Sequence, residues 1–257
     1  MRPPSFSLLA TGLTLGASLA ASLAHAAVTA VTTPPSCSAR GGPTAAPVVE
    51  LFTSEGCNSC PPADHWISTL KTDPGVVALA FHVDYWDRLG WKDRFASPAY
   101  TQRQAQTQAS SGARFSYTPQ VLLDGADRKD WSRIAAPSAQ RQRPAARVDI
   151  TLVREERRFS ATVVPASGAP ARLAAYWALT ENGHSTAVKA GENEGVTLKH
   201  DYVVREYQPV AAWNSANPAT LRFEPNTQRD PAYPAEVNLV IVDADSGRPL
   251  QALKLGC

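Results

Sequence analysis

The sequence has little excess charge and lacks the common signatures of cofactor binding. Its 257 residues include 25 Lys or Arg and 23 Asp or Glu, a formal net charge of +2. A net charge this close to zero argues against an electrostatic footprint for nucleic acid or a membrane surface. We find no Gly-rich phosphate loop, no nucleophilic serine elbow and no dinucleotide fingerprint. We therefore expect no cofactor and no nucleic-acid partner. Heptads and internal repeats are also absent.

The one extended run of small and apolar residues that resembles a targeting segment lies at the N-terminus. It covers residues 8–23, and Ala-His-Ala at 24–26 forms a small-x-small cleavage site. No later stretch is long and apolar enough to span a membrane. We expect residues 1–26 to be a cleaved signal peptide, and the mature protein to be periplasmic or secreted, with no membrane partner. Residues 27–46, rich in Ala, Thr, Pro and Gly, are expected to form a flexible leader.

The chain has only four cysteines, Cys37, Cys57, Cys60 and Cys257, and all follow the expected cleavage site. An exported compartment allows disulfides. Cys57 and Cys60 form a local Cys-x-x-Cys pair, whereas the other two lie near the ends of the mature chain. A bridge between these two would stabilise the fold by roughly 5 kcal/mol in the chain-entropy model. Their pairing stays open, because free thiols or a bridge between chains also fit the sequence.

The pair Cys57 and Cys60 is the most informative feature of the sequence. It follows the apolar run 48–52 and precedes a predicted helix that begins at Pro61 and ends before residue 73. Two intervening residues let the sulfurs face each other across one turn, and the positive end of the helix favours a thiolate. The pair stands on the loop that leads into this helix, and we expect it to be exposed there. Such exposure would favour thiol–disulfide exchange over an inert bridge.

Neighbouring residues moderate the acidity that this position would give the first thiol. Glu55 and Asp64 add negative charge near the sulfurs, and Pro61 and Pro62 remove two amide donors. We therefore expect Cys57 to be only moderately acidified.

Strand and helix signals alternate in the first half of the chain. Residues 76–83 are almost continuously apolar, which is typical of a buried parallel strand. Residues 97–108 begin with Ser-Pro, a helix-start signal, and the strand 120–123 precedes an Asp-Gly turn. Beyond a basic boundary at 141–147, apolar and polar residues alternate in many short segments. The pattern indicates an α/β domain followed by a β-rich, sandwich-like domain.

Thr118 and Pro119 stand directly before the strand 120–123. A Cys-x-x-Cys pair followed by Thr-Pro, a strand and Asp-Gly resembles the thioredoxin superfamily. The sequence is also similar, more narrowly, to a family of exported bacterial thioredoxin-like proteins that is described as a domain of unknown function. The segments that carry this similarity are VELFTSEGC (49–57), CPPAD (60–64), FHVDYWD (81–87), ENG (181–183) and HDYVVR (200–205).

The resemblance implies a particular division of the chain. A thioredoxin-like α/β domain is expected over residues 47–143 and a β-rich domain over residues 144–257. The resemblance also implies a periplasmic location, but it supplies no substrate.

The resemblance also implies roles for individual residues. Cys57 would be the attacking thiolate and Cys60 the resolving thiol, while Thr118 and Pro119, in a cis bond, would present backbone groups to a substrate. Thioredoxin has an acid in the strand before its cysteines. Glu50 is the nearest candidate here, but it lies one residue further from the pair.

Three functions remain open on the sequence. The leading one is a thiol–disulfide oxidoreductase that acts on a protein or small-molecule thiol or disulfide. The second is a copper or zinc module with Cys57, Cys60, His65 and His82 as ligands. The third is a non-catalytic binding protein, since fold does not fix function.

Polar residues in the β-rich half add one further candidate. Glu181, His184, His200 and Asp201 could form a second polar site. Isolated polar residues in a β-domain mostly face water, and we expect these to do so.

Overall fold

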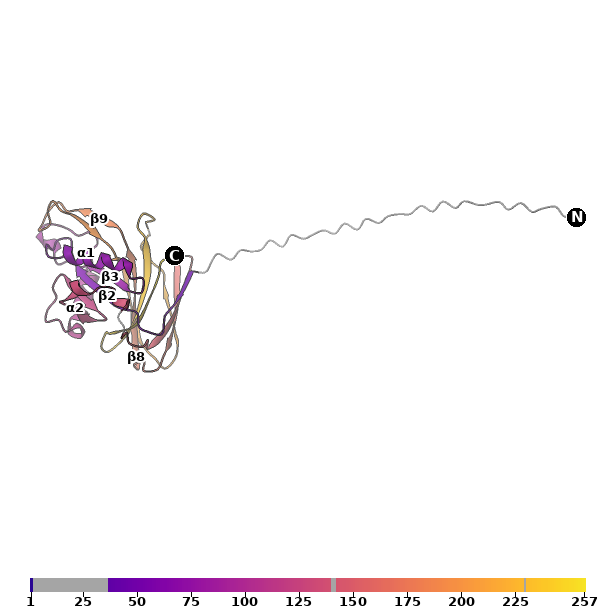
Figure 1. Cartoon of the computed structure of the whole chain (residues 1–257). Helices are drawn as coiled ribbons and strands as arrows, with labels where there is room; N and C mark the ends of the chain where they lie inside the picture. The colour runs from indigo at the N-terminus through magenta and orange to yellow at the C-terminus, as the bar shows by residue number, and fades with distance from the viewer. Residues whose placement is uncertain (2–36, 140–141, 229) are drawn as a thin grey trace. The chain divides into compact units, whose positions relative to one another are not determined.

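A computed structural model describes Met1 and residues 37–139, 142–228 and 230–257 (Figure 1). The expected signal peptide and the first part of the expected leader lie outside the described residues. Strand β1 (Cys37–Arg40) is the first element of the described residues. Within the described residues, no helix combines the length and apolar character needed to cross a membrane.

Most strands belong to one eight-stranded sheet with the order β14-β13-β8-β11-β3-β2-β4-β5. Its strands, in chain order, are β2 (Val48–Thr53), β3 (Val77–His82), β4 (Gln120–Leu123), β5 (Ala126–Asp127), β8 (Arg172–Glu181), β11 (Val203–Asn214), β13 (Ala235–Asp243) and β14 (Pro249–Leu255). The pairs β2–β3 and β3–β11 are parallel, and the other pairs are antiparallel.

The expected fold class, an α/β thioredoxin-like domain followed by a β-rich domain, is wrong. The described part of the chain is mostly β, and strands from both halves share the eight-stranded sheet. The physical reason lies in the backbone hydrogen-bonding groups along the free edge of β3. An exposed parallel edge would leave backbone N–H and C=O groups unpaired, and β11 from the second half pairs with it at Val203 and Ala80. The described residues from Cys37 onward accordingly belong to one compact unit.

A four-stranded antiparallel sheet packs against the C-terminal part of the large sheet. It has the order β1-β6-β7-β12, with β6 (Val148–Glu155), β7 (Arg158–Pro165) and β12 (Ala219–Phe223). Alternate residues of β6 and β7 face inward, as the period-two pattern predicts. Trp177 of β8 stacks on Phe223 of β12 at 5.5 Å between ring centroids, which joins the two layers. The β-sandwich expected in the second half is therefore present, but it shares one of its sheets with the first half.

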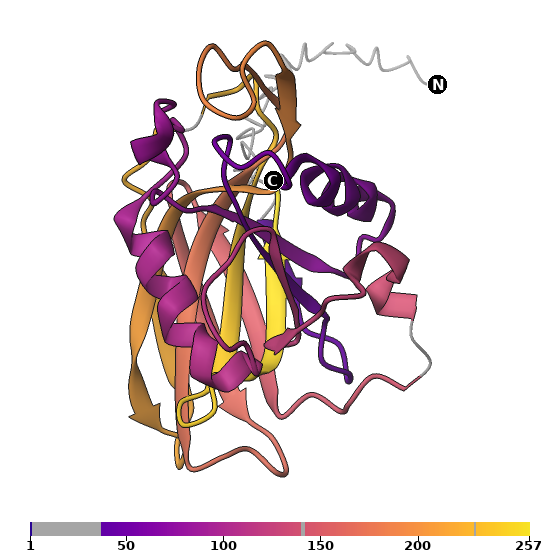
Figure 2. The same cartoon turned by 90° about the vertical axis from the view of Figure 1, so that its left-hand side faces the viewer.

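Helices α1 (Pro61–Thr69) and α2 (Pro98–Ser111) cover opposite faces of β2 and β3. Ile67 of α1 shares a core cluster with Leu51, whereas Tyr100 of α2 shares one with Phe52 and Phe81. Leu51 and Phe52 are consecutive residues of β2, so they point to opposite faces. Figure 1 shows the two helices grouped with these strands, and Figure 2, turned by 90°, shows α2 in magenta and α1 in indigo.

Shorter elements complete the fold. The 3-10 helices are η1 (Leu70–Thr72), η2 (Asp87–Leu89), η3 (Trp131–Arg133) and η4 (Pro137–Ala139). Strands β9 (His184–Ala187) and β10 (Thr197–His200) form a separate two-stranded antiparallel sheet. This hairpin lies between β8 and β11 in the sequence, and in space β10 lies beside α1.

A disulfide joins Cys37 to Cys257 across a sequence separation of 220 residues, with 6.1 Å between the Cα atoms. The pairing that the sequence left open is thus formed within the chain. It fixes the edge strand β1 to the residues that follow β14.

Candidate functional site

The cysteine pair lies at the start of α1. Cys57 and Cys60 form a disulfide with 5.4 Å between the Cα atoms. Cys60 is the residue before the helix, and Pro61 opens it, as the sequence predicts. The backbone N–H of Cys60 donates to the carbonyl of Cys57 at 3.2 Å, which holds the turn closed.

Thr118 and Pro119 are brought to the same place. Their peptide bond is cis. The hydroxyl of Ser59, between the two cysteines, lies 3.4 Å from the Cys57 sulfur and 3.5 Å from the Thr118 carbonyl oxygen, to which it donates. The indole N–H of Trp86 donates to the Thr118 hydroxyl at 2.7 Å. The four residues that the sequence analysis assigned to the site therefore belong to one local cluster.

The disulfide is buried, contrary to the expectation that it is exposed. Both Cys57 and Cys60 have 0% of their surface exposed. Part of the cover comes from the loop between β9 and β10, residues 188–196, which we call the lid loop. The side-chain amide of Asn193 in this loop donates to the carbonyls of Glu55 and Cys57, at 2.8 and 3.0 Å.

Three ionisable side chains are buried beside the pair. His200 Nε2 lies 3.4 Å from Glu55 Oε1, and His200 Nδ1 lies 3.9 Å from Asp64 Oδ1. The indole N–H of Trp91 donates to Glu55 at 2.8 Å, and the hydroxyl of Thr53 donates to Asp64 at 3.0 Å. Asp64 is on α1, one turn after Cys60, and its backbone N–H donates to the Cys60 carbonyl. The expectation that His200 faces water is therefore wrong.

The cluster places a positively charged His200 between the carboxylates of Glu55 and Asp64. Burial lowers the pKa of His200, but the nearby carboxylates of Asp64 and Glu55 outweigh it and raise the pKa to about 9. Burial raises the pKa of Glu55, but the contact with His200 and other hydrogen bonds outweigh it and lower the pKa below its ordinary value. At neutral pH an imidazolium therefore offsets the negative charge that the sequence analysis expected near the sulfurs.

A second histidine pair adjoins the first. His82 Nδ1 lies 2.6 Å from Asp93 Oδ2, and the ring centroids of His82 and His200 are 5.0 Å apart. Asp93 also accepts the backbone N–H of Glu55 at 2.9 Å. Burial raises the pKa of Asp93, but the charge and hydrogen bond of His82 outweigh it and lower the pKa. Asp93 thus ties the strand that carries His82 to the turn before the cysteines.

The alternative metal ligands are not brought together. His82 is paired with Asp93, while His65 is exposed on α1. Across the described ranges, no group of three or more His, Cys, Asp or Glu side chains is arranged to hold a metal ion.

The remaining polar candidates have separate roles. Glu181 accepts from His184 Nε2 at 2.9 Å, and both side chains are buried. Asp201 forms an ion pair with Lys71 at 2.7 Å and is also buried. The expectation that these residues face water is therefore wrong: each is buried with a partner of opposite charge or a hydrogen-bond partner.

Glu50 lies in another environment. It forms an ion pair with Arg103 of α2 and accepts the hydroxyl of Tyr176 at 3.1 Å. A proton-transfer role at the cysteines, which the resemblance suggested, would require breaking this buried pair.

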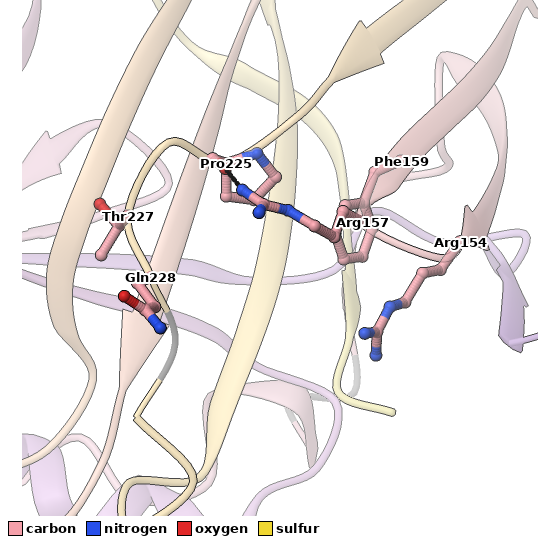
Figure 3. A pocket seen from close by; sticks show the side chains of 6 residues that line it. All are labelled: Arg154, Arg157, Phe159, Pro225, Thr227 and Gln228. Atoms are coloured by element: carbon pink, nitrogen blue, oxygen red, sulfur yellow. Dashed lines mark hydrogen bonds between the residues drawn. The ribbon is translucent and has the colours of Figure 1, made fainter.

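Two hollows differ in their relation to the cysteines. One, of about 310 Å³, lies between α1 and β10 and is lined in part by Pro61, Asp64 and His200. The other, of about 200 Å³, lies on the four-stranded sheet (Figure 3). There Arg157 donates to the carbonyl of Pro225 at 3.2 Å, and Arg154 donates to that of Cys257. The first hollow is thus lined by residues of the charged cluster, whereas the second is lined by residues far from the cysteine pair in the sequence.

The fold and site define a mostly β protein with a buried Cys-x-x-Cys disulfide and a charged cluster beside it. Comparison with protein families identifies the chain over residues 48–242 with a family described as "Protein of unknown function (DUF1223)". The chain belongs to this family, and the expected similarity to a family described as a domain of unknown function is confirmed. Among curated proteins, none matches the sequence significantly.

Two solved structures are similar. An X-ray crystal structure of an Agrobacterium tumefaciens protein has 28% identity and a TM-score of 0.59, and the match covers 82% of this chain and 94% of that one. The structure titled HBP35 of Porphyromonas gingivalis has 16% identity and a TM-score of 0.58, with 83% and 76% covered. Each match extends over more of the chain than either expected domain, which agrees with one continuous fold.

Proposed function

We propose that this protein performs thiol–disulfide exchange through Cys57 and Cys60. The observation that carries the proposal is the local disulfide at the start of α1, with Ser59 and Thr118 beside it. Electrons enter such a pair by attack of a thiolate on one sulfur, and the adjacent sulfur leaves as a thiolate.

Loop length supports an exchange role over a purely structural one. In the chain-entropy model a bridge between residues three apart contributes about 2 kcal/mol, whereas a bridge with the span of Cys37–Cys257 contributes about 5 kcal/mol. The long-range disulfide is therefore the one that contributes more to the stability of the fold. The local one stabilises it far less, so it is better suited to open and close.

The oxidised pair defines the direction of the first step. A substrate thiolate attacks the sulfur of Cys57, a mixed disulfide forms, and the Cys57–Cys60 bond breaks. Cys60 leaves as a thiolate and takes up a proton. A second thiolate of the substrate then attacks the mixed disulfide, which releases Cys57 and leaves the substrate oxidised by two electrons. The reverse sequence reduces a substrate disulfide.

The two disulfides also support a location in an oxidising compartment, where disulfides persist. We propose that the protein is exported to the periplasm or the cell exterior, since reducing conditions in the cytosol oppose disulfides. Detection of the intact Cys37–Cys257 bridge in protein isolated from cells under acid quench would support this location, and a fully reduced pair would contradict it.

The experiment that tests exchange uses serine variants of the pair. We expect Cys57→Ser to abolish turnover with insulin or glutathione disulfide, and Cys60→Ser to accumulate mixed disulfides on Cys57. The matched control is the double variant Cys37→Ser with Cys257→Ser, which removes the other bridge and should retain exchange at a temperature where it is folded. Full turnover by Cys57→Ser would contradict the proposal.

A further inference from the structure

Part of the cover beside Cys57 comes from the lid loop, a segment that the exchange reaction does not itself need. Asn193 in the lid loop is only 5% exposed and donates to the carbonyls of Glu55 and Cys57. Glu192, which is exposed, accepts the backbone N–H of Asn58 at 3.2 Å. A thiolate must approach a disulfide sulfur closely to attack it. With both cysteines fully buried, the closed conformation excludes such an attack.

The lid loop is closed within itself. The backbone N–H of Val188 donates to the carbonyl of Val196 at 2.9 Å, and that of Gly195 donates to the carbonyl of Val188 at 3.0 Å. Gly191 has a φ of +79°, and a Cβ there would lie 3.3 Å from the Cβ of Trp91. A glycine at this position thus lets the loop approach Trp91 closely. The loop is a defined turn, so its hydrogen bonds to the cysteine segment can break without unfolding the turn.

The ends of the hairpin are fixed to the rest of the fold through the buried His184 and His200, whereas its lid loop is held less firmly. Strands β9 and β10 pair with each other and, in the part of the chain that the structure describes, with no strand of the two larger sheets. Most residues of the lid loop are exposed, and only Val188 and Asn193 are buried. A two-stranded hairpin is marginally stable by itself, and segments with few buried contacts open at low free-energy cost.

We propose that the lid loop is a gate over the disulfide, and that the partner which displaces it is an extended polypeptide segment bearing cysteine. This inference rests on the proposed exchange function. Opening the gate uncovers two main-chain carbonyls, those of Glu55 and Cys57, and the main-chain N–H of Asn58. These groups lie in the turns before α1, and an extended peptide carries both N–H donors and C=O acceptors that replace the lost contacts. A small thiol lacks this series of groups and reacts only in the fraction of time that the gate is open.

The first test measures access to the disulfide without any biological substrate. The full-length oxidised protein is treated with the small reductant TCEP, and free Cys57 and Cys60 are counted by alkylation and mass spectrometry. Two hydrogen bonds worth about 1 kcal/mol each hold Asn193, so we expect Asn193→Ala to speed reduction by about tenfold or more. Glu192→Gln, which keeps an acceptor but removes its charge, should give a smaller increase in the same direction. It also provides a second variant if Asn193→Ala folds poorly.

Glu194→Ala is the matched control, since Glu194 is an exposed acid of the same loop. We expect it to be reduced at the wild-type rate. Equal reduction rates for wild type, Asn193→Ala and Glu192→Gln would overturn the gate, because the loop would then not limit access.

The second test compares a flexible dithiol peptide with dithiothreitol as reductants of the pair. We expect Asn193→Ala to increase the rate of reduction by dithiothreitol more than the rate of reduction by the peptide. The ratio of the peptide rate to the dithiothreitol rate should therefore fall. An unchanged ratio would refute the peptide as the displacing partner. Failure of the proposed function has a different signature, since insulin turnover would persist in Cys57→Ser whatever the lid variants do.

Discussion

His200 provides the positive charge that allows two carboxylates to remain buried beside the cysteine pair. Its two nitrogens face Glu55 at 3.4 Å and Asp64 at 3.9 Å, and its ring contacts that of His82, itself paired with Asp93. Burial lowers the pKa of His200, but the two carboxylates outweigh it and raise the pKa from 6.5 to about 9. We therefore predict that His200→Gln removes a pH-dependent part of the stability.

The size and the sign follow from this pKa. Each pKa unit corresponds to about 1.4 kcal/mol, so folding favours protonated His200 by about 3 kcal/mol. Because the pKa in the folded state lies above that in the unfolded state, this contribution is fully present below about pH 6.5. It is lost as pH rises through about 9. The wild-type free energy of unfolding should accordingly fall by about 3 kcal/mol across this window.

The assay is urea unfolding of the oxidised protein at about pH 6.5, 8 and 9.5. Burial lowers the pKa of His184, so its contribution to stability increases with rising pH and has the opposite sign to the fall. We expect His200→Gln to be less stable at the lowest pH and to lack the decline. The control is His65→Gln, since His65 is exposed on α1 and its variant should keep the wild-type decline. Parallel stability curves for wild type and His200→Gln would refute the reasoning.

Three further predictions concern the framework. Replacing both Cys37 and Cys257 by serine should lower the free energy of unfolding by about 5 kcal/mol, measured by urea unfolding; a loss below about 1 kcal/mol would show that the long loop is already constrained in the unfolded chain. Arg103→Met leaves Glu50 buried without its cation and should cost about 3–5 kcal/mol; restoration by the added change Glu50→Gln would support the ion pair as the cause, and no restoration would count against it. Trp177→Ala should cost about 3–5 kcal/mol in the same measurement, since its side chain is fully buried, whereas an unchanged unfolding midpoint would contradict its place in the core.

Local signals in the sequence predicted the elements around the cysteines. The apolar run 48–52 became β2, the two prolines after Cys60 opened α1, and the run 76–83 contains β3. Each depends on neighbouring residues alone, through periodicity, helix-start chemistry or a short apolar run. The position of Thr118 and Pro119 next to the pair came from the resemblance, and the hydrogen bond from Ser59 agrees with it.

Long-range pairing decided what the sequence could not predict. Val203 of β11 pairs with Ala80 of β3, and this contact joins the two expected domains into one sheet. Asn193 contacts Cys57 across 136 positions of sequence. No periodicity marks a loop that returns over a distant site. One usable signal was present for His200, since it opens HDYVVR, one of the segments on which the family resemblance rests.

The lid loop and the positively charged His200 belong to the same hairpin, β9–β10. Asn193 lies in the lid loop, and His200 ends β10, the strand that follows this loop. Displacement that reached β10 would withdraw the imidazolium from Glu55 and Asp64, and two ionised carboxylates beside Cys60 would then disfavour its thiolate. Displacement limited to the loop would leave the charges in place. TCEP reduction of His200→Gln separates these cases. A rate raised together with the lost pH dependence would mean that loop and strand open as one unit, whereas a wild-type rate would confine the gate to residues 188–196.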